Sequence, residues 1–356
     1  MTALPTGRRL TEYSPGGGCA CKLPKQVLDE VLDRVRVRPV PDPAVQVGLN
    51  PADDAVVYAV DETRAWVFTC DFLTPIVDDP YDWGRIAAAN ALSDVYAMGG
   101  RPLLTLNLLA WPADLTASPM LGEVLRGGVD MARQAGAWVL GGHSITDPLP
   151  KYGMVAVGEA DPGMLLTKDG GMPGDLLVLT KPIGVGVIAS AAKRGVATEA
   201  AVATAVATMT RLNADAATVA RDAGLRAATD VTGYGLAGHL HELTLASDLA
   251  AQVFTGDVPV LPAARELAEQ GHATDGGERT RMTGVADGWF VPGRAREPEQ
   301  VLVCDPQTSG GLLLAVPPAR LDQVLAGLRR AGDRTATVVG RLVVGPAGHV
   351  MLRTDG

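Results

Sequence analysis

The stretch from Ser14 to Pro24, SPGGGCACKLP, places two cysteines and a lysine directly after three glycines. A nearby ammonium group favours the thiolate, so Lys22 should lower the pKa of Cys19 from about 8.5 and make its sulfur a better nucleophile. Small neighbours leave this sulfur accessible, and consecutive glycines make the segment mobile. We interpret it as a mobile flap that brings the reactive thiol of Cys19 and the ammonium of Lys22 to a polyphosphate.

Other interpretations of the paired cysteines stay open at this point. Cys19 and Cys21 could ligate a soft metal or form a redox pair. A four-cysteine zinc site would also need Cys70 and Cys304, which sit in apolar runs. A flexible tail with incidental cysteines is disfavoured, because an exposed cysteine without a purpose is a liability.

Aspartates stand at several positions where a folded domain does not need them. Asp53 and Asp54 open one predicted strand, Asp71 follows the apolar run AWVFTC, and Asp230 precedes a glycine-rich turn. Any one of them alone would be interpreted as a turn or helix-cap residue. Asn90 and Asp94 lie four residues apart on a predicted alanine-rich helix and so share one face, where both ligation and solvation remain open.

Three glycine-rich turns accompany these carboxylates: GGHS at 141–144, KPIGVG at 181–186 and TGYGLAG at 232–238. Backbone amides in such turns can cradle phosphate oxygens. The last turn also satisfies G-x-G-x-x-G, with Asp257 about twenty residues further on, but this dinucleotide-binding signal is weak because only a short, poorly apolar strand precedes it. The chain contains no G-x-x-x-x-G-K-[ST] phosphate-binding loop.

Aspartates and phosphates in one site would repel each other by roughly 4 kcal/mol for each pair of charges about 4 Å apart at an effective dielectric near 20. Divalent cations must then lie between them, and Mg²⁺ is the natural choice because it prefers oxygen ligands shared with polyphosphate. The residues therefore predict a metal-bridged ATP site.

The elements that would position these residues form an alternating α/β pattern. Strands are predicted for AVVYAV, AWVFTC, LLTLNLLA, AWVLGG, LLVLT, VLVCD and GLLLAV, followed by two closing strands. Helices are predicted at 25–35, 82–100, 123–136, 185–194, 199–222, after the turn at 232–238, and at about 318–331. The Gly-, Pro- and Asp-rich segment 161–175 indicates a domain junction. We expect a mobile segment at 1–50, an ATP- and Mg²⁺-binding domain at 51–160 and a C-terminal α/β domain at 161–356.

Composition limits the class of protein. The chain has 356 residues, 47% of them apolar and only 4% aromatic, so its cores must be built mainly from Ala, Val and Leu. A net charge of −9 without a long basic run argues against nucleic-acid binding. The first residues lack the apolar run of a signal peptide, and no apolar run approaches the ~20 residues of a membrane span. We expect a cytoplasmic protein, not attached to a membrane, whose four cysteines stay reduced.

These motifs together carry a resemblance. GGGCACKLP, ADDAVVY, TCDFLTPIVDDPYDWGRIAAANALSDVYAMGG, LGGHSI, TKPIGVGV, TDVTGYGLAGHL and CDPQTSGGLLLAV follow one another over residues 11 to 345. In this order the chain resembles the selenophosphate synthetase, or selenide, water dikinase, family. The resemblance implies a mixed α/β, two-domain fold shared with aminoimidazole ribonucleotide synthetase, and a reaction in which ATP, selenide and water give selenophosphate, AMP and phosphate.

The resemblance also implies roles for individual residues. Cys19 and Lys22 match the catalytic pair, with Lys22 also binding ATP. Asp54, Asp94 and Asp230 match Mg²⁺ ligands. Nucleotide contacts match Asp53, Asp71, Asp94, Gly142, His143 and Ser144, with Asn90 as a neighbour. A homodimer formed through strands of the N-terminal domain and a dependence on K⁺ are implied by the resemblance alone.

Some positions depart from the family's pattern. The segment GGERTRM at 276–282 replaces a more usual glycine-threonine motif, so no role is assigned to it. Cys70 stands where threonine is expected and is interpreted as a small buried residue, Cys304 as packing at a strand end, and Cys21 as accessory. The rival functions are another ATP-using enzyme of the same fold, a thiol-based selenium or metal carrier regulated by nucleotide, and last a dinucleotide oxidoreductase.

Overall fold

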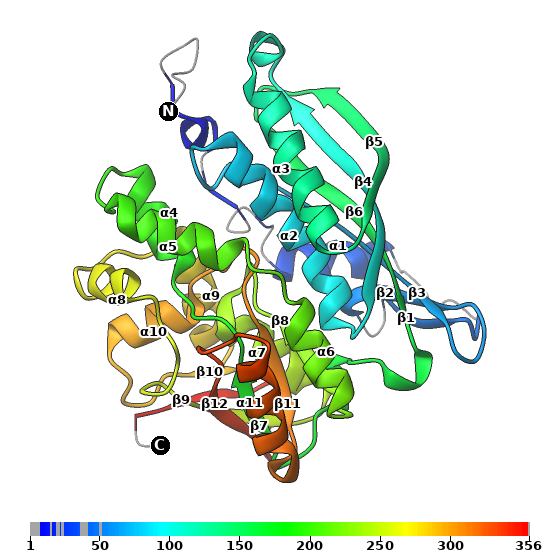
Figure 1. Ribbon diagram of the computed structural model, residues 1–356. Helices are drawn as coiled ribbons and strands as arrows, with labels where there is room; N and C mark the ends of the chain where they lie inside the picture. The colour runs from blue at the N-terminus through cyan, green and yellow to red at the C-terminus, as the bar shows by residue number, and fades with distance from the viewer. Residues whose placement is uncertain are drawn as a thin grey trace.

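The computed structural model describes residues 8–14, 16–18, 22, 25–35, 42–49 and 52–354. Its elements form two β-sheets, each packed against helices, with the N-terminal half above the C-terminal half in the view of Figure 1. The catalytic candidate Cys19 and the accessory Cys21 lie outside the described residues. Among the described residues, no helix combines the length and the apolar character needed to cross a membrane.

The first sheet has six strands in the order β1-β2-β3-β6-β4-β5. Its strands are β1 (Val45–Leu49), β2 (Ala52–Ala59), β3 (Ala65–Leu73), β4 (Arg101–Trp111), β5 (Trp138–Thr146) and β6 (Lys151–Ala160). All neighbours are antiparallel except β4 and β5. The predicted pairing of the runs AVVYAV and AWVFTC is confirmed by the β2–β3 hairpin.

Two helices, α2 (Pro80–Ala97) and α3 (Met120–Gln134), cover one face of this sheet. Helix α2 begins at the N-cap Asp79, whose carboxylate accepts a hydrogen bond from the Asp82 amide, and it ends before Gly99. The helices cross closely because glycines stand at the contact: a Cβ on Gly84 would lie 2.0 Å from the Val124 carbonyl oxygen. The predicted helices at 82–100 and 123–136 are confirmed, apart from their ends.

The opposite face of the first sheet carries exposed apolar side chains. On β3, Thr69 and Asp71 face α2, so the alternating residues Phe68, Cys70 and Phe72 face away from it. The prediction that Cys70 is buried is therefore wrong: its thiol is exposed. The apolar run around Cys70 suggested burial, but period-two alternation puts this residue on the uncovered face.

The second sheet has seven strands in the order β10-β13-β9-β12-β7-β11-β8. Its strands are β7 (Leu176–Leu179), β8 (Ala227–Asp230), β9 (Ala250–Phe254), β10 (Phe290–Val291), β11 (Leu312–Val316), β12 (Thr337–Val343) and β13 (Val350–Arg353). The helices of this half are α4 (Val185–Lys193), α5 (Glu199–Met209), α6 (Ala214–Asp222), α7 (Gly235–Ala246), α8 (Pro262–Glu269), α9 (Asp275–Ala286), α10 (Glu297–Cys304) and α11 (Leu321–Arg330).

Two predictions for this half are wrong. The run VLVCD is the end of helix α10 and not a strand, so Cys304 packs at a helix end. Its four residues Val301 to Cys304 are all buried, and a short apolar run buried on every side has no periodicity that separates helix from strand. The single helix expected at 199–222 is in fact two helices, α5 and α6. Between them lies the buried Asn213, whose side-chain amide donates a hydrogen bond to Ser93 of the N-terminal half.

The remaining elements connect these parts. Short 3₁₀ turns occur at Leu10–Tyr13, Ala113–Leu115, Pro162–Met164, Lys168–Gly170 and Pro318–Arg320. Helix α1 (Lys25–Val35) confirms the helix predicted at 25–35. The proposed domain limits stay a prediction; the change from one sheet to the other between β6 and β7 agrees with a junction in 161–175.

Candidate metal and nucleotide site

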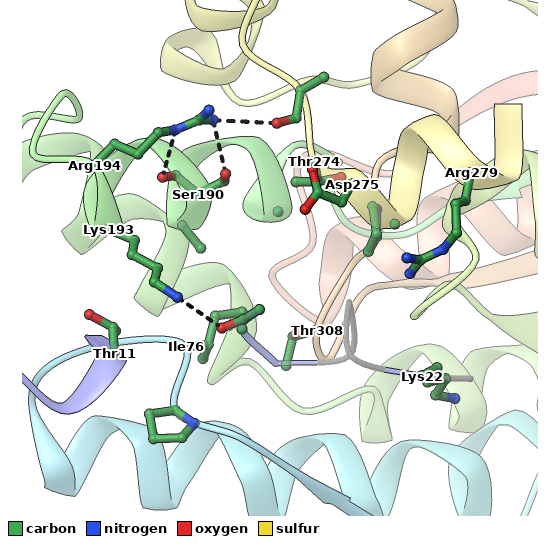
Figure 2. Close-up of a pocket in the computed structure, with 18 residues that line it drawn as sticks. Thr11, Lys22, Ile76, Ser190, Lys193, Arg194, Thr274, Asp275, Arg279 and Thr308 are labelled. Atoms are coloured by element: carbon green, nitrogen blue, oxygen red, sulfur yellow. Dashed lines mark hydrogen bonds between the residues drawn. The ribbon is translucent and has the colours of Figure 1, made fainter. Parts of the chain in front are cut away.

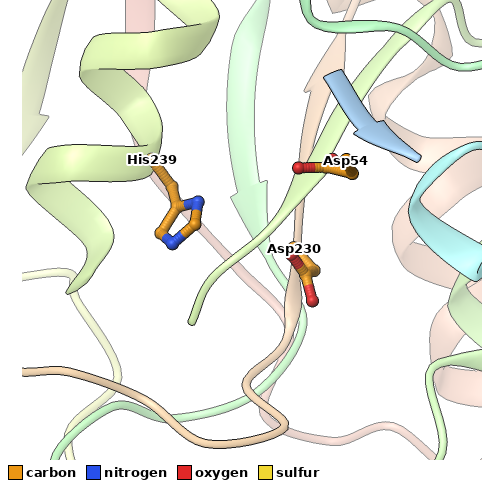
Figure 3. Close-up of side chains that lie close together, drawn as sticks. All are labelled: Asp54, Asp230 and His239. Carbon is orange, nitrogen blue, oxygen red and sulfur yellow. The ribbon is translucent and has the colours of Figure 1, made fainter. Parts of the chain in front are cut away.

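Three side chains from distant parts of the sequence meet between the two sheets. Asp54 comes from β2, Asp230 from the end of β8 and His239 from α7, and one ligand atom of each lies within 4.8 Å of the others (Figure 3). The sequence predicted the two aspartates as metal ligands but not His239.

Each of these residues directs an unused polar atom into the cluster. Within the described part of the chain, Asp54 Oδ2, Asp230 Oδ2 and His239 Nδ1 are buried without a hydrogen-bond partner. An unpartnered buried polar atom is costly unless something outside the chain binds it. The two carboxylate oxygens suit Mg²⁺, whereas imidazole is a more usual ligand for transition metals, so the aspartates fit the expected cation better than His239 does.

Burial and mutual repulsion disfavour the charged form of the carboxyl groups around this cluster. Burial, together with the charge of Asp54, raises the pKa of Asp230 to about 7 and that of Asp53 to about 7. Burial and the neighbouring charges of Asp230 and Asp71 also raise the pKa of Asp94 well above its usual value. A cation bound between these carboxylates would relieve this repulsion.

His239 is neutral at physiological pH. Burial lowers its pKa to about 3, although Glu242 acts in the opposite direction. Its Nε2 lies 3.1 Å from the Thr232 hydroxyl, at the turn before α7, which fixes the ring while Nδ1 faces the cluster. A neutral imidazole can serve as an acceptor for water or a cation.

Lys168 is a residue of this site that the sequence analysis missed. Its buried ammonium lies 2.6 Å from Asp54 Oδ1 and 3.0 Å from Glu242 Oε2, and its backbone amide donates to Asp53 Oδ2 at 2.8 Å. Lys168 therefore ties the junction between the sheets to both aspartates of β2. Its surroundings in the sequence, TKDGG, contain no periodic or motif signal that could have identified it.

Asp71, Asn90 and Asp94 lie on the facing sides of β3 and α2. The Asn90 amide donates to the Asp71 carboxylate, and the Thr69 hydroxyl donates to Asp94. The expectation that Asn90 and Asp94 share one helix face is therefore confirmed. Two polar pairs, Asp71 with Asn90 and Thr69 with Asp94, therefore join β3 to α2.

A loop of the C-terminal half, residues 307–311, is hydrogen-bonded to Asn90. The Ser309 amide donates to Asn90 Oδ1 at 2.8 Å, although Ser309 itself has the unusual φ of 49°. The fully buried Lys181 donates to the Ser309 carbonyl at 2.7 Å, and burial lowers the pKa of Lys181 well below its usual value. Asn213 adds a hydrogen bond to the Gly310 carbonyl at 2.8 Å. Both halves of the chain thus build the site.

One of the three glycine turns does not offer its amides to a ligand. In the segment 181–186, the Gly184 amide donates to Gln307 and the Gly186 amide donates to the buried Asp305. The idea that this turn cradles phosphate is therefore wrong, because side chains from the CDPQTSGG segment already occupy the N-terminus of α4. The turn 232–238 instead positions His239.

Lys22 lies beside the metal cluster. Its ammonium is 5.9 Å from the centre of the Tyr234 ring, and its positive charge lowers the pKa of both Asp230 and His239. The structure thus brings Lys22 to the carboxylates, while Cys19 lies outside the described residues.

Gly142, His143 and Ser144 lie far from this cluster. They belong to the exposed edge strand β5 and not to a turn after a strand, which corrects the sequence interpretation. Three strands, β3, β6 and β4, separate β5 from β2, which corresponds to about 19 Å along the sheet. Within one chain, His143 and Asp54 do not meet.

A separate cavity of about 670 Å³ opens between the N-terminal segment, α4 and α9 (Figure 2). Its lining includes Gly16, Gly17 and Lys22 from the predicted flap, and Asp275, Gly276 and Arg279 from the first turns of α9. The segment 276–282, which departs from the family's sequence pattern, is thus part of α9. The start of this helix forms one wall of the cavity.

Comparison with known proteins gives the class. The family model described as "AIR synthase related protein, N-terminal domain" matches residues 52–160, and the corresponding C-terminal domain matches 172–353. Thiamine-monophosphate kinase from Stenotrophomonas maltophilia aligns with a TM-score of 0.65 at 22% identity, covering 91% of this chain and 96% of that one. Hydrogenase maturation protein HypE in complex with ATP aligns with a TM-score of 0.62 at 17% identity, covering 97% and 94%. The chain has the two-domain AIR synthase-related fold, as expected.

Curated relatives narrow the class further. Selenide, water dikinase from Paraburkholderia xenovorans is 43% identical over 97% of both chains, and that from Pelobacter propionicus is 43% identical over 97% of this chain and 98% of its own. The enzyme of the same name from Carboxydothermus hydrogenoformans is 39% identical over 97% of this chain. The chain belongs to the selenide, water dikinase family, as the motifs predicted.

Proposed function

We propose that this enzyme makes selenophosphate from ATP, selenide and water, and releases AMP and phosphate. The observation that carries the proposal is the acidic cluster of Asp54 and Asp230, with unpartnered buried oxygens, in a chain related to selenide, water dikinases over 97% of its length. Aspartates and a polyphosphate repel each other, so they can share one site only when cations lie between them.

Within this proposal, Asp54, Asp94 and Asp230 hold Mg²⁺. Bound Mg²⁺ neutralises charge on the phosphates of ATP during transfer. Asp53, Asp71 and Asn90 bind or orient the nucleotide from the first sheet. Lys168 fixes Asp54 and Asp53, and the 307–311 loop fixes Asn90.

Lys22 supplies a mobile positive charge to the phosphates, a role that its nearness to Asp230 supports. Hydroselenide is already a strong nucleophile, so the chain mainly has to orient it in line with the γ-phosphorus and exclude competing water. Cys19 delivers selenium to that position. The ADP formed stays in the closed site, where water cleaves its β-phosphoryl group to give AMP and phosphate.

We further propose a homodimer formed through the first sheet. Its uncovered face and edge carry exposed apolar side chains on β2 to β5: Val56, Tyr58, Phe68, Phe72, Leu106, Trp138, Leu140 and Ile145. Trp138 and Leu140 are 68% and 65% exposed, and apolar patches of this kind are typical of protein interfaces. A second copy would also bring its own Gly142, His143 and Ser144 to a nucleotide that these residues cannot reach within one chain.

Three finer points complete the proposal. A K⁺ ion assists nucleotide binding, and a selenium-delivery protein supplies the selenide. The protein works in the cytoplasm, where a reducing environment keeps selenide and the thiols reduced. The exposed free thiol of Cys70 is compatible with that environment.

The test is anaerobic incubation of the purified protein with ATP, Mg²⁺ and selenide, followed by phosphorus-31 NMR. The proposal expects a selenophosphate resonance together with equal amounts of AMP and phosphate, and none of these without selenide. ADP and phosphate as the only products would indicate a related kinase acting on another nucleophile. ATP binding without turnover would indicate a thiol-based carrier, and either result would overturn the proposal.

A further inference from the structure

The cavity of about 670 Å³ is not part of the metal cluster. Asp54, Asp94 and Asp230 do not line it, and its walls come instead from α4, α9, the N-terminal segment and residues near Ile76. Lys22 connects the two sites, because it lines the cavity and its ammonium lies 5.9 Å from the centre of the Tyr234 ring, directly before the helix α7 that carries His239. A group that leaves the metal cluster past Lys22 would enter this cavity.

The lining is strongly cationic. Lys22, Lys193, Arg194 and Arg279 belong to the lining, and among its described residues Asp275 is the one carboxylate (Figure 2). The Arg194 guanidinium donates to the Ser190 hydroxyl at 2.9 Å and to the Ala273 carbonyl at 3.3 Å. These acceptors are neutral, so they orient the guanidinium without cancelling its charge. The cavity therefore favours an anion.

The rest of the lining is divided between hydroxyl groups and apolar surface. Ser190 and Thr308 carry hydroxyl groups on the lining, whereas Pro75, Ile76 and Pro306 offer apolar contact. A simple phosphate ion has four equivalent oxygens and no weakly hydrated atom that could pack against an apolar wall. An anion with oxygens on one side and a large, weakly hydrated atom on the other would match both surfaces.

We propose that this cavity binds a phosphorochalcogenate dianion, a phosphate in which sulfur or selenium replaces one oxygen. Its oxygens meet Arg279 and the hydroxyl groups, and its chalcogen meets the apolar wall. The choice of a chalcogen-containing ligand rests on the proposed function, whose product has this chemistry. The product would then bind in this cavity after it leaves the metal cluster and before it is released.

The test uses thiophosphate, a stable member of this class, and inorganic phosphate as the comparison. Each is titrated calorimetrically into the full-length protein saturated with Mg²⁺ and a non-hydrolysable ATP analogue, which blocks the nucleotide site. Thiophosphate should bind with one-to-one stoichiometry and more tightly than phosphate. Arg279→Gln should weaken it about tenfold or more, as expected for loss of a charged hydrogen bond.

Two further variants sharpen this result. Asp275→Asn removes the only carboxylate in the described lining and should tighten thiophosphate binding. Arg294→Gln changes the same charge at an exposed position outside the cavity and should have no effect. All three positions are exposed, so these variants should keep the fold.

Unchanged binding in Arg279→Gln, or loss of thiophosphate binding once the nucleotide analogue is present, would overturn the assignment. Equal affinity for phosphate and thiophosphate would overturn the role of the apolar wall. The readout needs no turnover, so it is independent of the selenophosphate experiment. Failure of turnover with intact, Arg279-dependent thiophosphate binding would count against the proposed reaction and not against the anion site.

Discussion

Asp54 is the residue on which the metal cluster most depends. One of its oxygens is paired with Lys168 and the other is buried without a described partner, so a cation would complete its coordination. Asp54→Asn keeps the shape but removes the charge. We expect Mg²⁺-dependent ATP binding to weaken at least about tenfold, measured by titrating Mg²⁺ at fixed ATP.

Asp61→Asn is the matched control, since Asp61 lies in the exposed turn after β2 and pairs with Arg64. It should leave the magnesium titration unchanged. An Asp54→Asn protein that titrates like the parent would remove Asp54 from the set of metal ligands.

The proposed role of the Cys19 thiol can be tested by substitution. A hydroxyl is a much weaker nucleophile than a thiolate and does not bind selenium, so Cys19→Ser should lose selenophosphate formation while it still binds ATP. Product by phosphorus-31 NMR and ATP binding by calorimetry separate the two effects. Cys70→Ser, at the exposed thiol of β3, is the control and should keep full activity. Undiminished product from Cys19→Ser would exclude Cys19 from the mechanism.

At this scale the sequence revealed residues whose chemistry is unusual for their local position. Asp53, Asp54 and Asp230 stood out because strands seldom begin or end with carboxylates that no turn requires. Lys168 and His239 did not stand out, because a lysine in a loop and a histidine on a helix are ordinary until the fold brings both of them to Asp54. Contacts between residues 115 or more positions apart depend on the packing of both sheets.

Among the elements, helix α4 has a feature that can be tested by pH. Its first amides, Gly186 and Val187, donate to the buried Asp305, and burial raises the pKa of that carboxyl to about 7. An unfolded aspartate titrates near about 3.9, so between these values the folded chain holds the extra proton and stability falls as pH rises. In Asp305→Asn this contribution is absent.

We therefore expect the Tm of the parent to fall more steeply than that of Asp305→Asn between about pH 4 and about pH 7, measured by scanning calorimetry. Asp322→Asn, at an exposed aspartate in the first turn of α11, is the control and should follow the parent. Parallel pH profiles for the parent and Asp305→Asn would show that Asp305 ionises normally in the folded protein.

The elements also show where sequence patterns lose information. Strands β2 to β5 were predictable from their apolar runs, whereas β1 and β6 were not predicted; helix α2, which is buried almost all round, was marked mainly by the glycines after its end. Helix α10 was missed because Val301 to Cys304 are buried all round and leave no period to detect. In the structure Glu299 accepts a hydrogen bond from the Arg296 amide at 2.9 Å in the manner of a helix cap, but arginine is not a usual N-cap residue, so the sequence did not reveal this helix start.

At the scale of the whole molecule, the site exists only when several parts are assembled. Ser309 and Asn90 join the two halves of the chain, and Lys168 joins the connection between the sheets to β2. The position of β5 adds a further requirement, because the residues Gly142 to Ser144 lie at the far edge of the sheet from Asp54. If they bind the nucleotide, they must bind it in another copy of the chain.

This arrangement predicts complementation between two inactive variants. Asp54→Asn and His143→Ala should each abolish most activity in a homodimer. In a mixed dimer with shared sites, one site would contain both changes and the other would contain neither, because Asp54 and His143 come from different copies. Random pairing makes half of the dimers mixed, so co-expression should restore about one quarter of the parent activity. Activity no higher than that of the separate variants, from a protein shown by light scattering to be dimeric, would place each nucleotide site within a single chain.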